Sequence, residues 1–308
     1  MDGFYQIGDI TQLLWFANKV NAGENNINAQ ITADIDFSGW EGTFPMIGNS
    51  TNYFAGIFDG QYHTITVKLT STSDNCGLFQ FASGTIKNLR VDGTIVSTHK
   101  FTSGVCAQSY AATFENIISS VTINSAMSGD SGIGGIVSRA SEAGTVINNC
   151  LVNFTINGTS ASNVGGIIGW TATAASISNC LSIPTFNCSS TDSYTIARNP
   201  GNAACTNVYY NTTFGGVNEG STLITAEQLA NGEVLALLNE GQEVAQWTQK
   251  EGQANPTPFP AGTGIEETVA DSAKTNNSNN AIYNLMGQKV QKAQKGIYII
   301  GGKKVLVK

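Results

Sequence analysis

The arrangement of apolar and polar positions between Cys76 and Tyr210 repeats with a period of roughly 27–33 residues, a range typical of solenoids, propellers and arrays. Each copy opens with a glycine and apolar residues, at Gly77, Gly104, Gly135 and Gly166. Each copy closes with an asparagine beside apolar residues, and a final partial copy adds a fifth. The asparagines are Asn88, Asn116, Asn149, Asn179 and Asn207. A large apolar residue follows the first four after seven positions, at Ile95, Ile123, Ile156 and Phe186.

The segments between these glycines are short, rich in Val, Ile and Thr, and interrupted by Gly, Asn and Ser, which predicts strands and turns. None has the 3.6-residue apolar period of a helical repeat. Such a copy buries its apolar side only by stacking on its neighbour. We therefore predict an all-β fold, a right-handed parallel β-helix. Stacking at about 4.8 Å aligns the five asparagines in a structural ladder that satisfies buried polar groups.

The regions before the repeats predict a cap and first strands. Apolar spacing from Leu13 to Val20 predicts a helix that starts at Asp9 or Thr11 and ends at Gly23. One buried face suits this helix to cover the N-terminal end of a solenoid. Polar and apolar residues then alternate over 31–37, which predicts a strand.

The region after Tyr210 predicts a second cap. Thr225-x-x-Gln228 is a capping-box signature, and the leucines after it supply an apolar face for two short helices. We expect a C-terminal lid, with Trp247 packed on the last coil. The next segment has too few large apolar residues to fold alone and predicts a linker. Apolar runs near the C-terminus predict a small tail of three strands. The resulting divisions are 1–50 (cap and first strands), 51–215 (repeats), 216–261 (lid), 262–280 (linker) and 281–308 (β tail).

Composition excludes several function classes. The net charge of −7 argues against a nucleic-acid partner, which needs a basic footprint. No apolar run is long enough to span a bilayer. The N-terminal residues lack the features of a signal peptide, so an exported protein would be a mature form. Of the six cysteines, Cys150 and Cys180 occupy core positions of the repeat, and we expect free thiols.

Two stretches resemble known families. The motif F-x-G-x-F-D-G at 54–60, with Gly77-Leu78-Phe79 and Ile86-x-Asn88-Leu89, resembles GLUG-repeat proteins. Such repeats occur in secreted and surface proteins of Bacteroidota, and outside the peptidase domain of some bacterial peptidases that cut immunoglobulins. The last 28 residues or so, at 281–308, resemble the C-terminal sorting signal of type IX secretion cargo. The two resemblances imply a secreted protein or one attached to the outer-membrane surface.

The linker carries one candidate modification site. Asp271-Ser272-Ala273 resembles the site at which Bacteroidota O-glycosylate exported proteins, which makes Ser272 the acceptor. A plain polar tether is the alternative.

Catalytic chemistry is absent from the repeat pattern. Many β-helices are polysaccharide lyases or hydrolases, which need converging carboxylates or a carboxylate–metal cluster. The acids of the repeats fall at different phases, so stacking does not bring them together. Asp34 and Asp36 share one side of the first predicted strand and form a weak Ca²⁺ candidate; hydrogen bonding to nearby backbone is the alternative. We expect neither an enzyme nor a cofactor.

A binding module remains, adhesin-like and directed at host or microbial glycans or surface proteins; the alternatives are a polysaccharide-active enzyme and a structural spacer. Aromatic side chains could stack on sugars, although core or end-cap positions would also explain them. Ice-binding solenoids carry flat threonine rows, but Thr64-x-Thr66 does not recur at one phase. We expect a monomer. The candidate binding residues are Tyr53, Tyr62, Tyr110, Trp170 and Tyr194.

Overall fold

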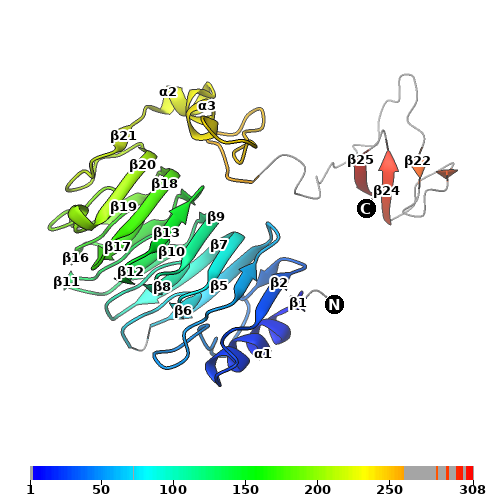
Figure 1. The fold of residues 1–308 in the computed structure, drawn as a ribbon, viewed down its shortest axis with the longest axis horizontal. Coiled ribbons are helices and arrows are strands. Elements are labelled where there is room, and N and C mark those ends of the chain that lie inside the picture. The colour runs from blue at the N-terminus through cyan, green and yellow to red at the C-terminus, as the bar shows by residue number, and fades with distance from the viewer. Residues whose placement is uncertain are drawn as a thin grey trace. The chain divides into compact units, whose positions relative to one another are not determined.

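The computed structural model describes residues 3–71 and 73–259, together with four tail strands between 282 and 307. The chain divides into two compact units, residues 1–260 and 261–308. The first unit is a parallel β-solenoid of about seven turns (Figure 1). Cap, repeats and lid therefore share one folded unit.

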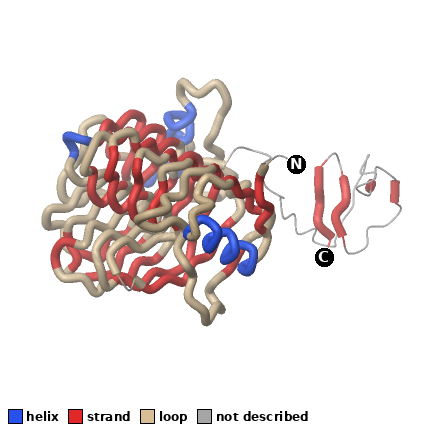
Figure 2. The backbone as a smooth tube through the Cα atoms, turned by 60° about the horizontal axis from the view of Figure 1, so that its bottom comes forward, coloured by secondary structure: helices blue, strands red, loops and turns tan. Residues whose placement is uncertain are grey.

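Each coil of the solenoid contributes strands that pair in parallel with the same strands of the next coil, so they run side by side along the molecule (Figure 2). The longest ladder contains β1 (Phe4–Ile7), β2 (Asn28–Ile31), β4 (Ile57–Asp59), β7 (Thr85–Ser97), β9 (Thr113–Ser119), β13 (Thr145–Asn148), β18 (Ala175–Ser182), β20 (Ala203–Tyr210) and β21 (Ser221–Leu223). The adjoining stretches of the same sheet are β3 (Ile35–Asp36), β5 (Thr64–Thr70), β10 (Thr122–Ser125), β14 (Leu151–Val152), β15 (Thr155–Gly158) and β19 (Thr185–Cys188).

A separate four-stranded sheet forms another side of the middle coils. Its order is β17-β12-β8-β6, and a two-stranded ladder of β11 and β16 lies between it and the long sheet in sequence. The strands are β6 (Phe79–Ala82), β8 (Cys106–Tyr110), β11 (Gly129–Asp130), β12 (Val137–Glu142), β16 (Ala161–Ser162) and β17 (Ile168–Thr171). A 3-10 turn, η1 (Pro200–Asn202), precedes β20.

The interior is filled by identical repeat positions stacked coil on coil. The apolar residues seven positions after the first four asparagines are direct register partners: Ile95, Ile123, Ile156 and Phe186. All but Phe186 are fully buried, and Phe186 packs against the cluster from its edge. Because a parallel strand pair places equal positions next to each other, one apolar residue per repeat builds a continuous core.

Helix α1 (Ile10–Asn21) covers the N-terminal end of the solenoid, as predicted (Figure 1). The carboxylate of Asp9 accepts a hydrogen bond from the backbone of Gln12 at 2.8 Å and so caps the helix. The buried face includes Phe16, whose ring lies 6.0 Å from that of Phe54 and 5.9 Å from that of Phe58. The predicted single strand over 31–37 is wrong, because the chain turns a corner between β2 and β3.

The five repeat asparagines stand at one corner of successive coils and are aligned in register. All five have φ between 51° and 53°, in the left-handed region that asparagine tolerates better than other non-glycine residues. Amide side chains bond along parts of the row: Asn116 donates to Asn88 at 2.9 Å, and Asn207 donates to Asn179 at 3.2 Å. The corner therefore needs asparagine for its backbone as well as for its amide.

The row is interrupted at its centre. The Asn149 amide oxygen instead accepts hydrogen bonds from Gln242 at 3.1 Å and from the indole of Trp247 at 3.3 Å. The amide oxygen of Asn116 is buried without a partner. A segment from beyond the repeats has therefore inserted into the asparagine row.

That segment corrects the predicted lid. Helices α2 (Ala226–Ala230) and α3 (Glu233–Asn239) and the residues after them lie along the side of the solenoid, and Trp247 packs on the middle coils. We call residues 226–259 the strap. It covers a second apolar cluster, built on outward-facing side chains two residues after the asparagine corners: Ile118, Leu151, Leu181 and Tyr209. Far along the strap, the Phe259 ring lies 5.0 Å from that of Tyr62.

The last coil is covered by the loop after β20 and not by the strap. Phe214 stacks on Phe186 with a centroid separation of 4.0 Å and an interplanar angle of 8°. Phe214 also packs against the interior cluster. An aromatic side chain from a short loop thus helps to shield this end.

The second unit contains a four-stranded antiparallel sheet of order β23-β22-β24-β25, where three strands were predicted. Its strands are β22 (Ile282–Tyr283), β23 (Lys289–Val290), β24 (Gly296–Ile300) and β25 (Lys303–Val307). The first predicted strand is therefore two short strands that pair with each other. The predicted linker and Ser272 lie outside the described residues. Within the described part of the chain, no helix could cross a membrane.

We expect Asn149→Leu to lower the free energy of unfolding by about 1–3 kcal/mol, because it leaves the buried indole N–H of Trp247 unpaired. Leucine also tolerates the left-handed corner poorly. Asn149→Gly relieves the backbone strain but not the lost hydrogen bonds, so its stability should fall between the two. Chemical denaturation measures all three proteins. A leucine variant as stable as the parent would contradict the role of this corner.

We expect Trp247→Ala to cost about 3–5 kcal/mol, the range for truncating a buried large aromatic side chain. Trp247 is 1% exposed, and Asn239 clamps its backbone with hydrogen bonds of 2.9 and 3.0 Å. Loss of the indole should loosen the strap and increase binding of a hydrophobic dye. Val244→Ala, in the same segment at a side chain 66% exposed, serves as the control and should change neither signal.

Candidate functional site

The sheet of β6, β8, β12 and β17 carries one row of large side chains that lies outside the interior cluster. Four members are direct register partners, and Tyr53 adds a fifth because its neighbour Phe54 bridges to Ala82. Equivalent positions in neighbouring strands are about 4.8 Å apart. We call this row the aromatic–arginine face; it consists of Tyr53, Phe81, Gln108, Arg139 and Trp170.

One end of the face is aromatic. The Tyr53 ring stacks on Phe81 at 5.7 Å and on Tyr110, a neighbour of the row, at 4.2 Å. The neighbouring Tyr110 hydroxyl, with burial adding to its effect, raises the pKa of Tyr53. Both tyrosines remain partly exposed, whereas Phe81 is buried beneath them. Two stacked phenol rings thus offer an apolar surface with hydroxyls beside it.

The centre of the face is an amide fixed in place. The Gln108 side chain donates to the Asn75 amide oxygen at 2.5 Å and accepts from the Ser141 hydroxyl at 2.6 Å. Both bonds cross between coils, so they hold Gln108 in one orientation.

Arg139 follows Gln108 in the row and stacks on an aromatic ring. Its guanidinium lies 5.4 Å from the ring centroid of Phe101. That ring is packed so closely against Gly132 that a Cβ there would come within 2.8 Å of it. The Nε atom of Arg139 is buried and has no hydrogen-bond partner. Within the described residues, Arg139 forms no ion pair, unlike Arg90 and Arg198, the other two arginines of the chain.

At the other end of the face, the Trp170 indole is covered by Arg198, whose charge is paired with Asp130. The Arg198 guanidinium covers Trp170 at 4.3 Å from the ring centroid. Asp130 accepts from Arg198 at 3.2 Å and from Lys100 at 2.9 Å. One face of the Trp170 ring is therefore occupied, so this indole is less available for stacking than the sequence suggested.

Of the five predicted aromatic residues, Tyr53, Tyr110 and Trp170 lie on or beside the aromatic–arginine face. Tyr62 and Tyr194 do not. Tyr62 lies against the strap residue Phe259, and burial raises its pKa. The ring of Tyr194 fills the space beside Gly216, where a Cβ would come within 2.3 Å of it. These two tyrosines pack within the fold.

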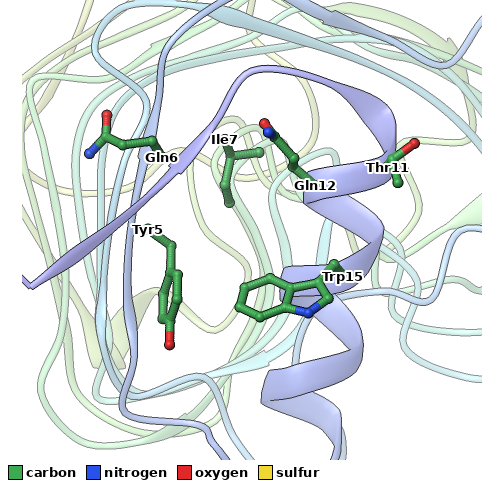
Figure 3. Close-up of a pocket in the computed structure, with 6 residues that line it drawn as sticks. All are labelled: Tyr5, Gln6, Ile7, Thr11, Gln12 and Trp15. Carbon is green, nitrogen blue, oxygen red and sulfur yellow. The ribbon is translucent and has the colours of Figure 1, made fainter.

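A separate pocket lies at the N-terminal end, between β1 and α1 (Figure 3). It has a volume of about 330 Å³ and is lined by Tyr5, Gln6, Ile7, Thr11, Gln12 and Trp15. The Tyr5 and Trp15 rings meet edge to face at 5.0 Å. The Gln12 amide oxygen already accepts from the backbone of Gly8, and the Gln6 amide donates to Gln30. Few polar groups are left to orient a ligand there.

Thr64 and Thr66 do not recur in the next coil, where their register partners are Arg90 and Asp92, but a threonine row at a different repeat position is present. Outward-facing threonines of β7, β10, β15 and β19 are register partners: Thr94, Thr122, Thr155 and Thr185. Beside them, Asn187 donates to Asn157 at 2.9 Å, and Asn157 donates to Asn124 at 3.0 Å. Along that ladder the asparagine amides hydrogen-bond to one another.

The acidic side chains that form ion pairs are held at separate places. Asp59 lies 3.6 Å from the Lys87 ammonium, and Asp92 pairs with Arg90 at 3.1 Å. His63 is paired with Asp34, its Nδ1 lying 3.2 Å from the carboxylate. The described residues contain no group of three or more His, Cys, Asp or Glu side chains that could hold a metal ion.

The proposed Ca²⁺ pair, Asp34 and Asp36, is divided between two backbone contacts. Asp34 accepts from the backbone of Thr64 at 2.8 Å and so fixes the next coil. Asp36 accepts from the backbone of Ser38 at 2.8 Å, and these hydrogen bonds lower its pKa. Each of the two carboxylates thus accepts a hydrogen bond from nearby backbone.

All six cysteines are free; four are buried, and Cys188 and Cys205 are half-buried. Burial raises the pKa of Cys76, Cys188 and Cys205 to about 12 and also raises those of Cys106 and Cys150. Because the thiolate is the reactive form, these side chains are poor nucleophiles near neutral pH.

We expect the native protein at pH 8 to react slowly with Ellman's reagent, because hardly any thiolate exists at that pH when the pKa is about 12. The non-reduced protein should expose six reactive thiols in denaturant. Fewer than six would reveal a disulfide and contradict the free-thiol state. The reaction should accelerate as the pH rises towards 12.

Sequence reasoning missed Phe81, Gln108 and Arg139, although a signal was present. Each row member on the four strands lies four residues after the repeat glycine, as Trp170 does after Gly166. This position changes from Phe to Gln, Arg and Trp, whereas the residue after it stays small: Ala82, Ser109, Ala140 and Thr171. A variable large residue at a fixed repeat phase marks an outward row.

The comparisons with known proteins yield a shared fold. No family model and no curated protein matches the chain. A solved structure does: the crystal structure of a putative immunoglobulin A1 protease from Bacteroides ovatus, at a TM-score of 0.60 and 17% identity. The match covers 83% of this chain and 93% of that one. At this identity the likeness establishes that the two chains share the solenoid architecture.

Proposed function

We propose that this protein is a non-enzymatic, exported or surface-attached β-solenoid that binds glycans through the aromatic–arginine face. The observation that carries the proposal is the in-register row from Tyr53 to Trp170, in which stacked phenols and a guanidinium stand on either side of the buried, fixed amide of Gln108. Sugars offer apolar ring faces and many hydroxyls, so aromatic surfaces with positioned polar groups suit them.

The dimensions of the face fit a chain of sugars. Five positions at about 4.8 Å span roughly 19 Å, the length of a short oligosaccharide. The row is rigid, because its side chains stand on paired strands and Gln108 is tied to two coils. A preorganised surface loses little conformational entropy on binding.

Export is supported by resemblance and by fold. The GLUG-like first coil and the sorting-signal-like tail are features of Bacteroidota surface proteins, and the solenoid neighbour comes from Bacteroides ovatus. Non-enzymatic action is supported by the carboxylates, since Asp59, Asp92 and Asp130 are each engaged by a different cation.

A glycan array should identify ligands, and calorimetry should then compare variants. We expect Tyr53→Ala and Tyr110→Ala each to weaken binding about tenfold, equivalent to about 1.4 kcal/mol, because each removes half of the stacked platform. Tyr5→Ala, in the N-terminal pocket, is the matched control and should bind like the parent. An array without any ligand, or binding lost only in the Tyr5 variant, would refute this site.

The absence of catalysis is tested on the same ligands. Products should show no new reducing ends or unsaturated sugars after long incubation. Because the structural neighbour bears the name of an immunoglobulin A1 protease, that glycoprotein belongs among the test substrates. We expect its heavy chain to stay intact. Cleavage that persists in highly purified protein would show an enzyme.

A further inference from the structure

Arg139 is a charged group without a charged partner. It is partly buried, its Nε atom has no hydrogen-bond partner, and its side chain joins no carboxylate within the described residues. Burying a charge is costly unless it is paired. The stack on Phe101 orients the guanidinium but supplies no hydrogen-bond acceptor for its N–H groups.

The other arginines show that the chain pairs such groups elsewhere. Arg90 also has a buried Nε without a partner, but its guanidinium is bound by Asp92 at 3.1 Å, two residues away in the same strand. Arg198 is bound by Asp130 at 3.2 Å, although its guanidinium also covers an aromatic ring. Stacking on a ring is thus combined with a carboxylate at Arg198 but not at Arg139. With 22 acidic residues against 15 basic ones, carboxylates are not scarce in this chain.

The position of Arg139 puts this unpaired cation within the proposed binding row. Its register partners are Gln108 on one side and Trp170 on the other. An arginine fork donates two parallel hydrogen bonds to a carboxylate or a sulfate, with geometric specificity that a lysine lacks.

We propose that Arg139 is the specificity-determining residue of the face and binds the anionic group, carboxylate or sulfate, of an acidic glycan. This inference rests on the proposed function and narrows its ligand class. The sugar rings lie along the row, and the acidic substituent meets the guanidinium held by Phe101. Overall attraction does not account for such selection, because the protein carries a net charge of −7.

The test uses the full chain and two matched pairs of polymers. Polygalacturonate is compared with its methyl ester, and dextran sulfate with dextran, by affinity electrophoresis and calorimetry. We expect the acidic member of at least one pair to bind at least tenfold more tightly than its neutral partner. The pair that responds distinguishes a carboxylate from a sulfate ligand. Added NaCl should weaken acidic binding more than any neutral binding.

The deciding variant is Arg139→Met, which keeps an apolar stem against Phe101 and removes the charge. It should lose at least tenfold in affinity for the acidic polymer and at most twofold for a neutral glycan found by the array. Arg90→Met makes the same change at a paired arginine outside the face and should bind like the parent. Thermal melts of both variants establish that they fold.

Two results would overturn the inference. One is that neither acidic polymer binds more tightly than its neutral partner. The other is that the folded Arg139→Met variant binds the acidic polymer as the parent does. Neutral glycan binding that needs Tyr53 and Tyr110 would survive either result and would leave the proposed function standing.

Discussion

In-register stacking of parallel strands at one left-handed corner is the constraint on which this solenoid depends. Each coil must bend at the same place, and five asparagines with φ near 52° do so. Once that corner is fixed, every other position of the repeat falls on its equivalent in the next coil. The interior column from Ile95 to Phe186 and the outward row from Phe81 to Trp170 follow from the same register. A slip by one residue would exchange the two faces of a strand.

The corner also explains the strap. Two residues after the asparagines, the chain places Ile118, Leu151, Leu181 and Tyr209 on the outside. Left uncovered, this stripe would be an apolar surface of the kind that invites association. The strap covers it and uses the broken asparagine row as an anchor, where Asn149 accepts from Trp247. The amide oxygen of Asn149 therefore links the strap to the asparagine corner.

The features that recur in every repeat were predicted from the sequence, whereas the contacts between segments far apart in the sequence were missed. Repeated glycines, asparagines and isoleucines define strands, coil and interior, because stacking makes each repeat position one structural environment. The side position of the strap was not predicted. Its partners lie about 100 residues away, Trp247 and Asn149 for example, and no local pattern records that pairing. The apolar pair Leu151-Val152 could have warned that this strand is buried on both faces.

The candidate site was only half visible for a related reason. The sequence prediction was based on single aromatic residues, without knowledge of strand register. It therefore included Tyr53, Tyr110 and Trp170, but also Tyr62 and Tyr194, which pack against other parts of the fold. The row is recognised only from the strand register, because Gln108 and Arg139 belong to it only when the strands are aligned. In a solenoid the inward positions must stay alike for coils to stack, whereas outward positions are free to differ. Variation at one outward phase, set on a rigid ladder, is how a repetitive backbone can present a non-repetitive surface to a ligand.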